Sequence, residues 1–257
     1  MGSLKGRTAL ITGASRRIGI GFGTARRLAS MGADLFLHSF SQYDKQLQTY
    51  REEDNSAEMR AELEAFGIAV KQLDADFLDA LAPALVMKSA AAAFGHVDIL
   101  VLNHTYDTLK KLDELTAEEI DRHLHVNIRA SLLLIQEFAR QHDGRQGGRI
   151  IMLTSGQHLG PMEDTAYAAS KGALHQLTPS LSSELIEKGI TVNTVNPGPT
   201  KTYEPSAEVS KAVLERMPQG RWGEADDAAR LISWLVSDDA QWITGQVIDS
   251  EGAFQRG

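Results

Sequence analysis

The sequence predicts one α/β domain: a doubly wound parallel sheet with helices on both faces. Three observations predict this fold class. A length of 257 residues suits a single large domain with a sizeable core. Short, continuously apolar runs alternate with helical patterns, as expected for parallel strands covered on both faces. A glycine-rich turn joins the first apolar run to the first helical pattern.

The apolar runs have the length of strands, and the helical patterns between them have the length of helices. Strands are expected at residues 8–12, 34–38, 69–73, 97–101, 149–153, 190–195 and 246–249. Helices are expected at residues 20–31, 56–66, 79–94, 116–141, 165–188 and 225–236. The short run at 69–73 is expected to complete the second βαβ step.

Two further segments are polar or irregular. Residues 41–55 are expected to form a surface excursion, and residues 197–218 form the clearest irregular segment. Neither has the features of a domain boundary, and no internal repeat or low-complexity linker is present. Residues 1–257 are therefore expected to form one domain.

Composition excludes several classes of function. The net charge of −8, with arginine and lysine scattered along the chain, argues against a nucleic-acid partner. The absence of cysteine excludes disulfides, a cysteine nucleophile and a thiolate metal site, and we expect no metal. No apolar stretch approaches the ~18 residues of a membrane span, and no signal-peptide core precedes the first strand. We expect a cytoplasmic protein without a membrane partner.

The most informative stretch begins where the strand at 149–153 ends. Thr154 and Ser155 supply hydroxyl groups, and Tyr167 follows Ser155 by twelve residues. Tyr167 and Lys171, at positions i and i+4, share one face of the expected helix. An ammonium group beneath the phenol favours the phenolate, which would make the tyrosine a usable general acid and base.

The same Tyr-x-x-x-Lys spacing occurs a second time, at Tyr106 and Lys110. The residues twelve and thirteen positions before Tyr106 are Phe94 and Ala93, which offer no hydroxyl group. Tyr106 also follows a strand end among turn-like residues. We expect this second copy to be a loop tyrosine.

The glycine-rich turn predicts a cofactor site. Gly13, Gly19 and Gly21 follow the first strand and open the first helix, in the order found in a Rossmann-like fold. Glycines there let backbone amides approach a pyrophosphate at the positive end of the helix dipole. The alternative is a glycine-rich turn that binds no ligand.

The second strand indicates which cofactor is preferred. It ends at His38-Ser39-Phe40, without the carboxylate that often binds the ribose 2′-hydroxyl of NAD. Arg16 or Arg17 would suit the 2′-phosphate of NADP, since guanidinium pairs well with phosphate. We therefore predict NADP(H) over NAD(H). The alternative is that these arginines only cover the surface.

From Arg7 to about Gly252 the chain resembles the short-chain dehydrogenase/reductases. Beside the two sites above, Asp76-Phe77, Asn127 and the segment Asn196-Pro-Gly-Pro-Thr200 match landmarks of that family in order and spacing. The resemblance implies that Ser155, Tyr167, Lys171 and Asn127 are catalytic. It implies cofactor contacts for Gly13, Ser15, Arg16, Arg17, Gly19, Ile20, Gly21, Ser39, Asp76, Phe77, Asn103, Tyr167, Lys171, Pro197, Gly198, Thr200 and Thr202.

Three features depart from the family pattern. Arg17 stands in the glycine loop where many relatives have glycine, or else the loop carries two extra residues before Gly19. The usual Asn-Asn-Ala-Gly is Leu102-Asn-His104-Thr here, so that His104 either contacts substrate or is structural. The spacing between Ser155 and Tyr167 is one residue short of the commonest value, which leaves Thr154 as the alternative hydroxyl.

The resemblance implies an NADP(H)-dependent oxidoreductase that transfers a hydride to or from a carbonyl or alcohol, either a 3-oxoacyl thioester or a small ketone. The alternatives are a pteridine-type reductase and a non-catalytic NADP-binding scaffold. We expect the substrate pocket to use His104, Gln157, His158, Met162, Tyr203 and residues 207–217. The resemblance also implies a homo-oligomer, commonly a tetramer, that associates through the two long helices.

Overall fold

The computed structural model describes residues 3–46 and 55–256. Within this part of the chain, seven parallel strands form one sheet in the order β3-β2-β1-β4-β5-β6-β7. The strands are β1 (Thr8–Ile11), β2 (Asp34–Ser39), β3 (Val70–Asp74), β4 (Ile99–Leu102), β5 (Gly148–Leu153), β6 (Ile190–Asn196) and β7 (Val247–Asp249). The predicted doubly wound fold is confirmed, and each predicted strand is present to within one or two residues.

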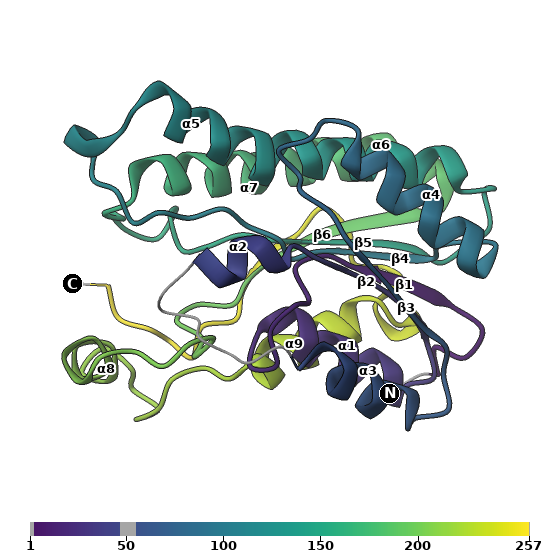
Figure 1. The fold of residues 1–257 in the computed structure, drawn as a ribbon, viewed down its shortest axis with the longest axis horizontal. Helices are drawn as coiled ribbons and strands as arrows, with labels where there is room; N and C mark the ends of the chain where they lie inside the picture. Colours follow the sequence, from purple (N-terminus) through teal and green to yellow (C-terminus); the bar gives the residue numbers. More distant parts are fainter. Residues whose placement is uncertain (1–2, 47–54, 257) are drawn as a thin grey trace.

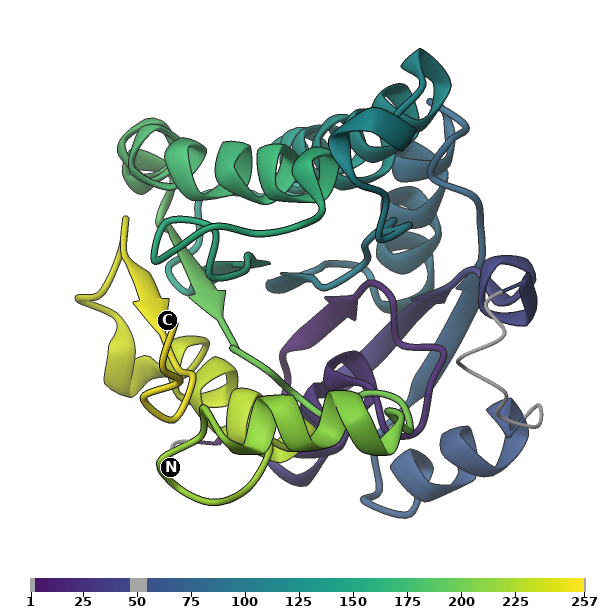
Figure 2. The same cartoon turned by 90° about the vertical axis from the view of Figure 1, so that its left-hand side faces the viewer.

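Helices cover both faces of the sheet (Figure 1). One face carries α1 (Ile20–Ser30), α3 (Ser56–Glu64) and α9 (Ala225–Leu235). The other carries α4 (Ala82–Phe94), α5 (Ala117–His123), α6 (Ala130–Gln141) and α7 (Thr165–Leu185). Two further helices are α2 (Ser41–Gln46) and α8 (Ala207–Leu214), and α8 lies at the end of the molecule that Figure 2 turns toward the viewer.

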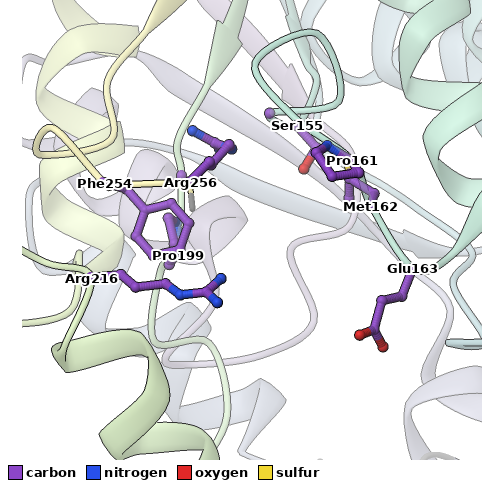
Figure 3. Close-up of a pocket in the computed structure, with 10 residues that line it drawn as sticks. Ser155, Pro161, Met162, Glu163, Pro199, Arg216, Phe254 and Arg256 are labelled. Atoms are coloured by element: carbon purple, nitrogen blue, oxygen red, sulfur yellow. The ribbon is translucent and has the colours of Figure 1, made fainter.

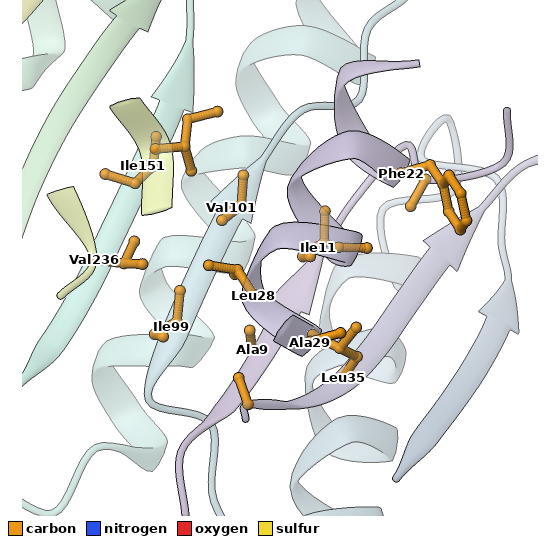
Figure 4. Packing of buried hydrophobic residues seen from close by; sticks show 14 of the residues in the cluster. Ala9, Ile11, Phe22, Leu28, Ala29, Leu35, Ile99, Val101, Ile151 and Val236 are labelled. Atoms are coloured by element: carbon orange, nitrogen blue, oxygen red, sulfur yellow. The ribbon is translucent and has the colours of Figure 1, made fainter. Parts of the chain in front are cut away.

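The sheet separates two hydrophobic cores. Successive strand residues point to opposite faces, so that Ile151 packs beside α1 and α9 while Ile150 packs beside α4 and α6. Figure 4 shows the first core, where Leu28 of α1 lies among strand residues such as Ile99 and Val101. Because both faces of the central strands are buried, β1 and β4 carry apolar residues on both faces, which explains the runs seen in the sequence.

The order of the strands reverses between β1 and β4, and the glycine turn lies at this switch point. Gly13 has a φ of +65°, and a Cβ there would lie 2.8 Å from the Cα of His104. Only glycine fits this close approach of two backbones. In folds of this type, ligands bind at the carboxyl ends of the strands beside the switch point.

Several expected boundaries were wrong for identifiable reasons. The helix expected at 116–141 is divided into α5 and α6 by a π-helix, Leu124–Arg129. The helix expected from residue 79 begins at Ala82, where Pro83 suits the first turn. The segments expected to be irregular contain α2 and α8, and residues 47–54 of the expected surface excursion lie outside the described residues. No helix in the described ranges is long and apolar enough to span a membrane.

Candidate active site

The end of β5 is hydrogen-bonded to α7. The Lys171 ammonium donates to the Leu153 carbonyl at 3.0 Å, and the Thr154 hydroxyl donates to the Lys171 carbonyl at 2.9 Å. Thr154 is buried and its hydroxyl is engaged in this contact, whereas Ser155 lines an adjacent cavity. Of the two hydroxyl groups that the sequence offered, the geometry favours Ser155.

Tyr167 and Lys171 form one turn of α7, as the i, i+4 spacing predicted. The Lys171 Nζ lies 5.5 Å from the centre of the Tyr167 ring. The lysine is 3% exposed, and burial lowers its pKa to about 8, while the negative charge of Asp107 opposes this shift. Lys171 is therefore protonated near neutral pH and loses its charge at mildly alkaline pH.

Asn127 lies in the π-helix between α5 and α6. Its amide oxygen accepts from the Tyr106 N–H at 2.7 Å, and its amide nitrogen donates to the Tyr106 carbonyl and the Ser170 hydroxyl at 3.0 and 2.9 Å. The wider turn of a π-helix commonly occurs at functional sites. Here it places Asn127 between the segment that follows β4 and the turn of α7 that carries Lys171.

The first turn of α7 is fixed by Asp164. Its carboxylate caps the helix by accepting from the Tyr167 N–H at 2.9 Å, and it also accepts from the Leu109 N–H at 3.1 Å. Leu109 has a φ of +55°, a strained conformation for leucine that these contacts hold in place. Asp164 thus anchors both Tyr167 and the loop that follows β4.

A second carboxyl group, Asp107, lies against Asp164. Burial, together with the hydrogen bond to Asp164, raises the pKa of Asp107 to about 7. Burial opposes a lowered pKa at Asp164, but hydrogen bonds from Asp107 and the Tyr167 N–H outweigh it. The pair therefore holds one proton, located on Asp107, over much of the acidic range.

His123 completes a group that has the donor atoms of a metal site. One donor atom each from Asp107, His123 and Asp164 lie within 4.8 Å of one another. His123 is fully buried, its Nδ1 donates to the Glu119 carbonyl at 2.8 Å, and its Nε2 faces Asp164 at 3.9 Å. Asp107 and Asp164 can lie this close together because they share one proton. The expectation that the chain uses no metal stays a prediction.

The glycine turn fits a dinucleotide pyrophosphate. Helix α1 begins after Gly19 without a side-chain cap and has no acidic residue in its first turn, which leaves its positive end free for an anion. A Cβ on Gly21 would lie 2.5 Å from the Gly13 carbonyl oxygen and 2.7 Å from the amide nitrogen of Asn103. Asn103 donates to that carbonyl at 2.8 Å and so fixes the turn.

The two arginines of the turn have partners within the protein. Arg16 donates to the Thr202 carbonyl at 3.2 Å, which links the glycine turn to the segment after β6. Arg17 forms an ion pair with Glu62 of α3. Ser39, at the end of β2, is buried and accepts from Gln72 at 3.2 Å. The predicted pairing of an arginine with a 2′-phosphate stays a prediction.

Two histidines and Phe77 fill the interior beside the switch point. Phe77 is buried and stacks on His38 with ring centres 4.0 Å apart, and His104 packs edge-on against Phe77 at 4.6 Å. The Thr12 hydroxyl donates to His104 Nδ1 at 2.7 Å, and Nε2 donates to the Val126 carbonyl at 3.1 Å. Burial lowers the pKa of both histidines, so they are neutral. His104 is structural.

The segment after β6 is packed against the C-terminal residues. Gly198 has a φ of +64°, and a Cβ there would overlap with Glu251. Asn196 donates to the Glu251 carboxylate at 2.9 Å, and Thr200 donates to the carbonyl groups of Pro197 and Gly198 at 3.2 Å. The last strand and the residues after it therefore help to form this edge of the site.

A cavity of about 520 Å³ opens at this edge (Figure 3), which is an ordinary volume for a small-molecule site. It is lined by Ser155, Gly156, Pro161, Met162, Glu163, Gly198, Pro199, Arg216, Phe254 and Arg256. Of the residues expected to form the pocket, Met162 and a member of the 207–217 segment line it. His104 does not, because its ring is turned into the core. No periodic pattern marks Phe254 and Arg256, which follow the last strand.

Most of the predicted cofactor residues lie at one edge of the sheet. They follow the carboxyl ends of β1, β2, β3, β4 and β6, or lie on α7 beside the end of β5. Asp76 accepts from the Leu78 N–H at 2.8 Å and shapes the turn after β3.

The second Tyr-x-x-x-Lys copy, at Tyr106 and Lys110, is a loop, as expected. Tyr106 and Lys110 both bind Glu119.

A doubly wound sheet with a glycine turn at its switch point places the chain in the Rossmann-like class of α/β proteins. The sequence model of a family described as enoyl-(acyl carrier protein) reductase matches residues 13–254. The chain is 39% identical over 254 residues to an oxidoreductase of Bacillus subtilis named uncharacterized oxidoreductase YjdA, with 98% of both chains covered. The chain belongs to the short-chain dehydrogenase/reductase family and is an oxidoreductase of that type.

Two further relatives are informative. The chain is 34% identical over 258 residues to 2-dehydro-3-deoxy-D-gluconate 5-dehydrogenase of Pseudoalteromonas atlantica, with 98% of this chain and 97% of the relative covered. A crystal structure of a short chain dehydrogenase from Burkholderia cenocepacia in complex with NADP has a TM-score of 0.86 and 34% identity. That match covers 97% of this chain and 98% of the other.

Proposed function

We propose that the chain is a single-domain, NADP(H)-dependent oxidoreductase that transfers a hydride between nicotinamide and a carbonyl or alcohol substrate. The observation that carries the proposal is the buried Lys171 ammonium, 5.5 Å from the Tyr167 ring, on a turn of α7 bonded to the end of β5. The same strand end leads into Ser155 at the wall of the cavity. We propose that the Ser155 hydroxyl, the Tyr167 phenol and the Lys171 ammonium act together on one substrate oxygen.

Tyr167 is assigned the proton transfer. When bound, the nicotinamide cofactor supplies or accepts the hydride. During reduction the Tyr167 hydroxyl donates its proton to the carbonyl oxygen, and during oxidation the phenolate removes the proton from the alcohol. Lys171 is protonated at neutral pH, and its positive charge favours the phenolate.

Ser155 and Asn127 support that step in different ways. The Ser155 hydroxyl donates a hydrogen bond to the substrate oxygen and stabilises the negative charge that develops there. The Asn127 amide already makes hydrogen bonds to the Tyr106 backbone and to Ser170. We therefore assign Asn127 a positioning role, which holds the segment after β4 against α7.

The glycine turn would hold the pyrophosphate through the N–H groups at the start of α1, and Gly198 and Thr200 are proposed to contact the nicotinamide amide. We propose a preference for NADP(H). Its support is the absence of a carboxylate at the end of β2, the presence of Arg16 and Arg17, and the NADP bound to the Burkholderia relative. For Arg17, pairing with a 2′-phosphate would require it to leave Glu62.

The proposed substrate is a small ketone or a 3-oxoacyl thioester, and the reaction takes place in the cytoplasm. A relative that shares 34% of its residues is named for the oxidation of a small hydroxy compound, which favours the small ketone. The arginine-rich glycine turn keeps a pteridine-type reductase as a second candidate. A non-catalytic NADP-binding scaffold would need the Tyr167 and Lys171 turn to have no catalytic use.

The test is an NADPH oxidation assay against a panel of ketones, 3-oxoacyl thioesters and dihydropterins, repeated with NADH. We expect turnover with a ketone and a lower Michaelis constant for NADPH than for NADH. Tyr167→Phe should lower kcat by about 10²–10⁴-fold, the usual contribution of an acid/base group, and should bind NADPH with nearly unchanged affinity by fluorescence titration. NADPH binding without turnover on any carbonyl compound would support the scaffold and overturn the proposal.

A further inference from the structure

We propose that the substrate carries a carboxylate or a comparable oxyanion in addition to its reacting carbonyl or alcohol group, and that Arg216 binds this anion. The inference rests on the proposed function, because it concerns the substrate of the same site. It is carried by an arginine without a partner, by the charges of the other cavity residues and by the position of Ser155 in the same cavity.

Arg216 lies just after α8, and its backbone is fixed. Its N–H donates to the Val213 carbonyl at 3.0 Å, and its carbonyl accepts from the Gln255 N–H at 2.9 Å. Its side chain extends from the wall that contains Pro199 and Phe254 toward the wall that contains Glu163 (Figure 3). These backbone hydrogen bonds fix the position from which the guanidinium group enters the cavity.

The Arg216 guanidinium is unpaired. Every other arginine in residues 3–46 and 55–256 has a hydrogen bond or an ion pair to a side chain or a backbone carbonyl, and Arg216 has neither. Guanidinium groups bind carboxylates and phosphates through two parallel N–H···O bonds. An unpaired guanidinium in the cavity that contains Ser155 therefore points to an anionic ligand.

The second arginine of the cavity is already neutralised. Arg256 donates to both carboxylate oxygens of Glu251, at 2.5 and 2.7 Å, and its guanidinium lies 5.1 Å from the Phe254 ring centre. A Cβ on Gly156 would overlap with Arg256, so that the arginine is packed against the loop that follows Ser155. Arg256 forms part of the cavity wall and leaves Arg216 as the cation available to a ligand.

Glu163 limits the charge of the ligand. It lines the cavity on the wall opposite Arg216 (Figure 3). One anionic group can bind Arg216 while the rest of the molecule contacts the apolar Pro161 and Met162. A second negative charge near Glu163 would be repelled. The expected substrate is therefore a monoanionic oxo or hydroxy acid.

The inference is tested with pairs of compounds that differ only in charge. The pairs are 3-oxobutanoate, 4-oxopentanoate and 5-oxohexanoate, each compared with its methyl ester in the NADPH oxidation assay. We expect at least one acid to exceed its ester in kcat/KM by about 10-fold or more, because a charge-assisted hydrogen bond commonly contributes this much. Arg216→Ala should remove that preference by raising KM for the acid while leaving the ester unchanged.

Lys211→Ala is the matched control, since Lys211 is an exposed cation on α8 that pairs with Glu215. It removes one positive charge from the same helix and should keep the preference for the acid. Glu163→Gln should lower KM for the acid, because it removes a negative charge from the cavity. Arg216→Lys should recover part of the lost preference. Isothermal titration with the corresponding acid that lacks the oxo group should rank the affinities of wild type, Arg216→Lys and Arg216→Ala in that order.

Two outcomes overturn the inference. One is that every ester is reduced at least as well as its acid, and the other is that Arg216→Ala affects acid and ester equally. In both cases turnover of the esters leaves the proposed oxidoreductase function intact. If no carbonyl compound in any assay is reduced, the proposed function fails, and the inference fails with it.

Discussion

Lys171 shows how burial tunes a single residue of the site. A solvated lysine has a pKa near 10.5, whereas burial lowers the pKa of Lys171 to about 8. The cost of burying the charge is reduced by the hydrogen bond to the Leu153 carbonyl and by the negative charge of Asp107. The ammonium group is thereby buried near the Tyr167 ring, where its charge acts on the phenol more strongly than it would in water.

Asp107 gives a prediction at the same scale. Its pKa is about 7 in the folded protein and near 3.8 in the unfolded chain, so the folded state binds more protons between these values. Stability that is present below pH 3.8 is therefore lost as the pH rises through 7. Asp107→Asn cannot ionise and should be more stable than the wild type at pH ~8, with a smaller difference at pH ~5.

Urea denaturation of both proteins at the two pH values measures this difference. Asparagine keeps the acceptor for the Leu109 N–H, so the substitution changes charge with little change in shape. Glu208→Gln, at the exposed start of α8, serves as a control for the loss of one negative charge. A difference between Asp107→Asn and wild type that does not change with pH would contradict the buried, protonated carboxyl group.

At the scale of elements, the glycine turn and the segment after β4 form one unit. Asn103 donates to the Gly13 carbonyl, and the Cβ position of Gly21 is occupied by these same groups. Gly21→Ala should therefore open the turn, lower the melting temperature by several degrees and weaken NADPH binding by about 10-fold or more, because overpacking commonly costs 1–3 kcal/mol.

Differential scanning fluorimetry and NADPH titration measure the two effects. Gly172→Ala is the control, because the nearest atom to a new Cβ there lies 3.8 Å away and alanine is favourable in a helix. It should keep the melting temperature or raise it. Unchanged NADPH affinity in Gly21→Ala would show that the turn does not form the pyrophosphate site.

At the scale of the whole molecule, exposed apolar side chains predict self-association. Trp242 is 95% exposed, and Ile120 and Leu124 of the α5 region are each 40% exposed. Large exposed apolar groups commonly mark interfaces. These side chains support self-association, and the family resemblance implies a homotetramer, with a mass about four times that of the 28.0 kDa chain.

Size-exclusion chromatography with light scattering measures that mass. Trp242→Ser or Ile120→Asp should shift the mass toward smaller species. Phe66→Ser should not, because Phe66 follows α3 on the face of the sheet opposite the two long helices that are expected to associate. A monomeric wild type across the micromolar range would show that these side chains do not form a stable interface.

The features determined by the sequence alone are those whose physical cause is local. Continuous apolar runs follow from burial on both faces of a strand, the glycine turn follows from a backbone that tolerates no side chain, and the Tyr167 and Lys171 spacing follows from the pitch of a helix. These three signals predicted the fold class, which the structure confirms, and they predicted Tyr167 and Lys171 on one turn of a helix. The other positions expected at the site were implied by the family resemblance.

The features decided only by the tertiary structure depend on residues that are distant in the sequence. The proton shared by Asp107 and Asp164, the engagement of the Thr154 hydroxyl, the burial of His104 in the core and the unpaired Arg216 beside Arg256 all arise where separate elements meet. No periodic pattern encodes such contacts, because they depend on which strand ends the sheet brings together. The sequence therefore indicates the chemistry at Tyr167, and the fold decides which charges surround it.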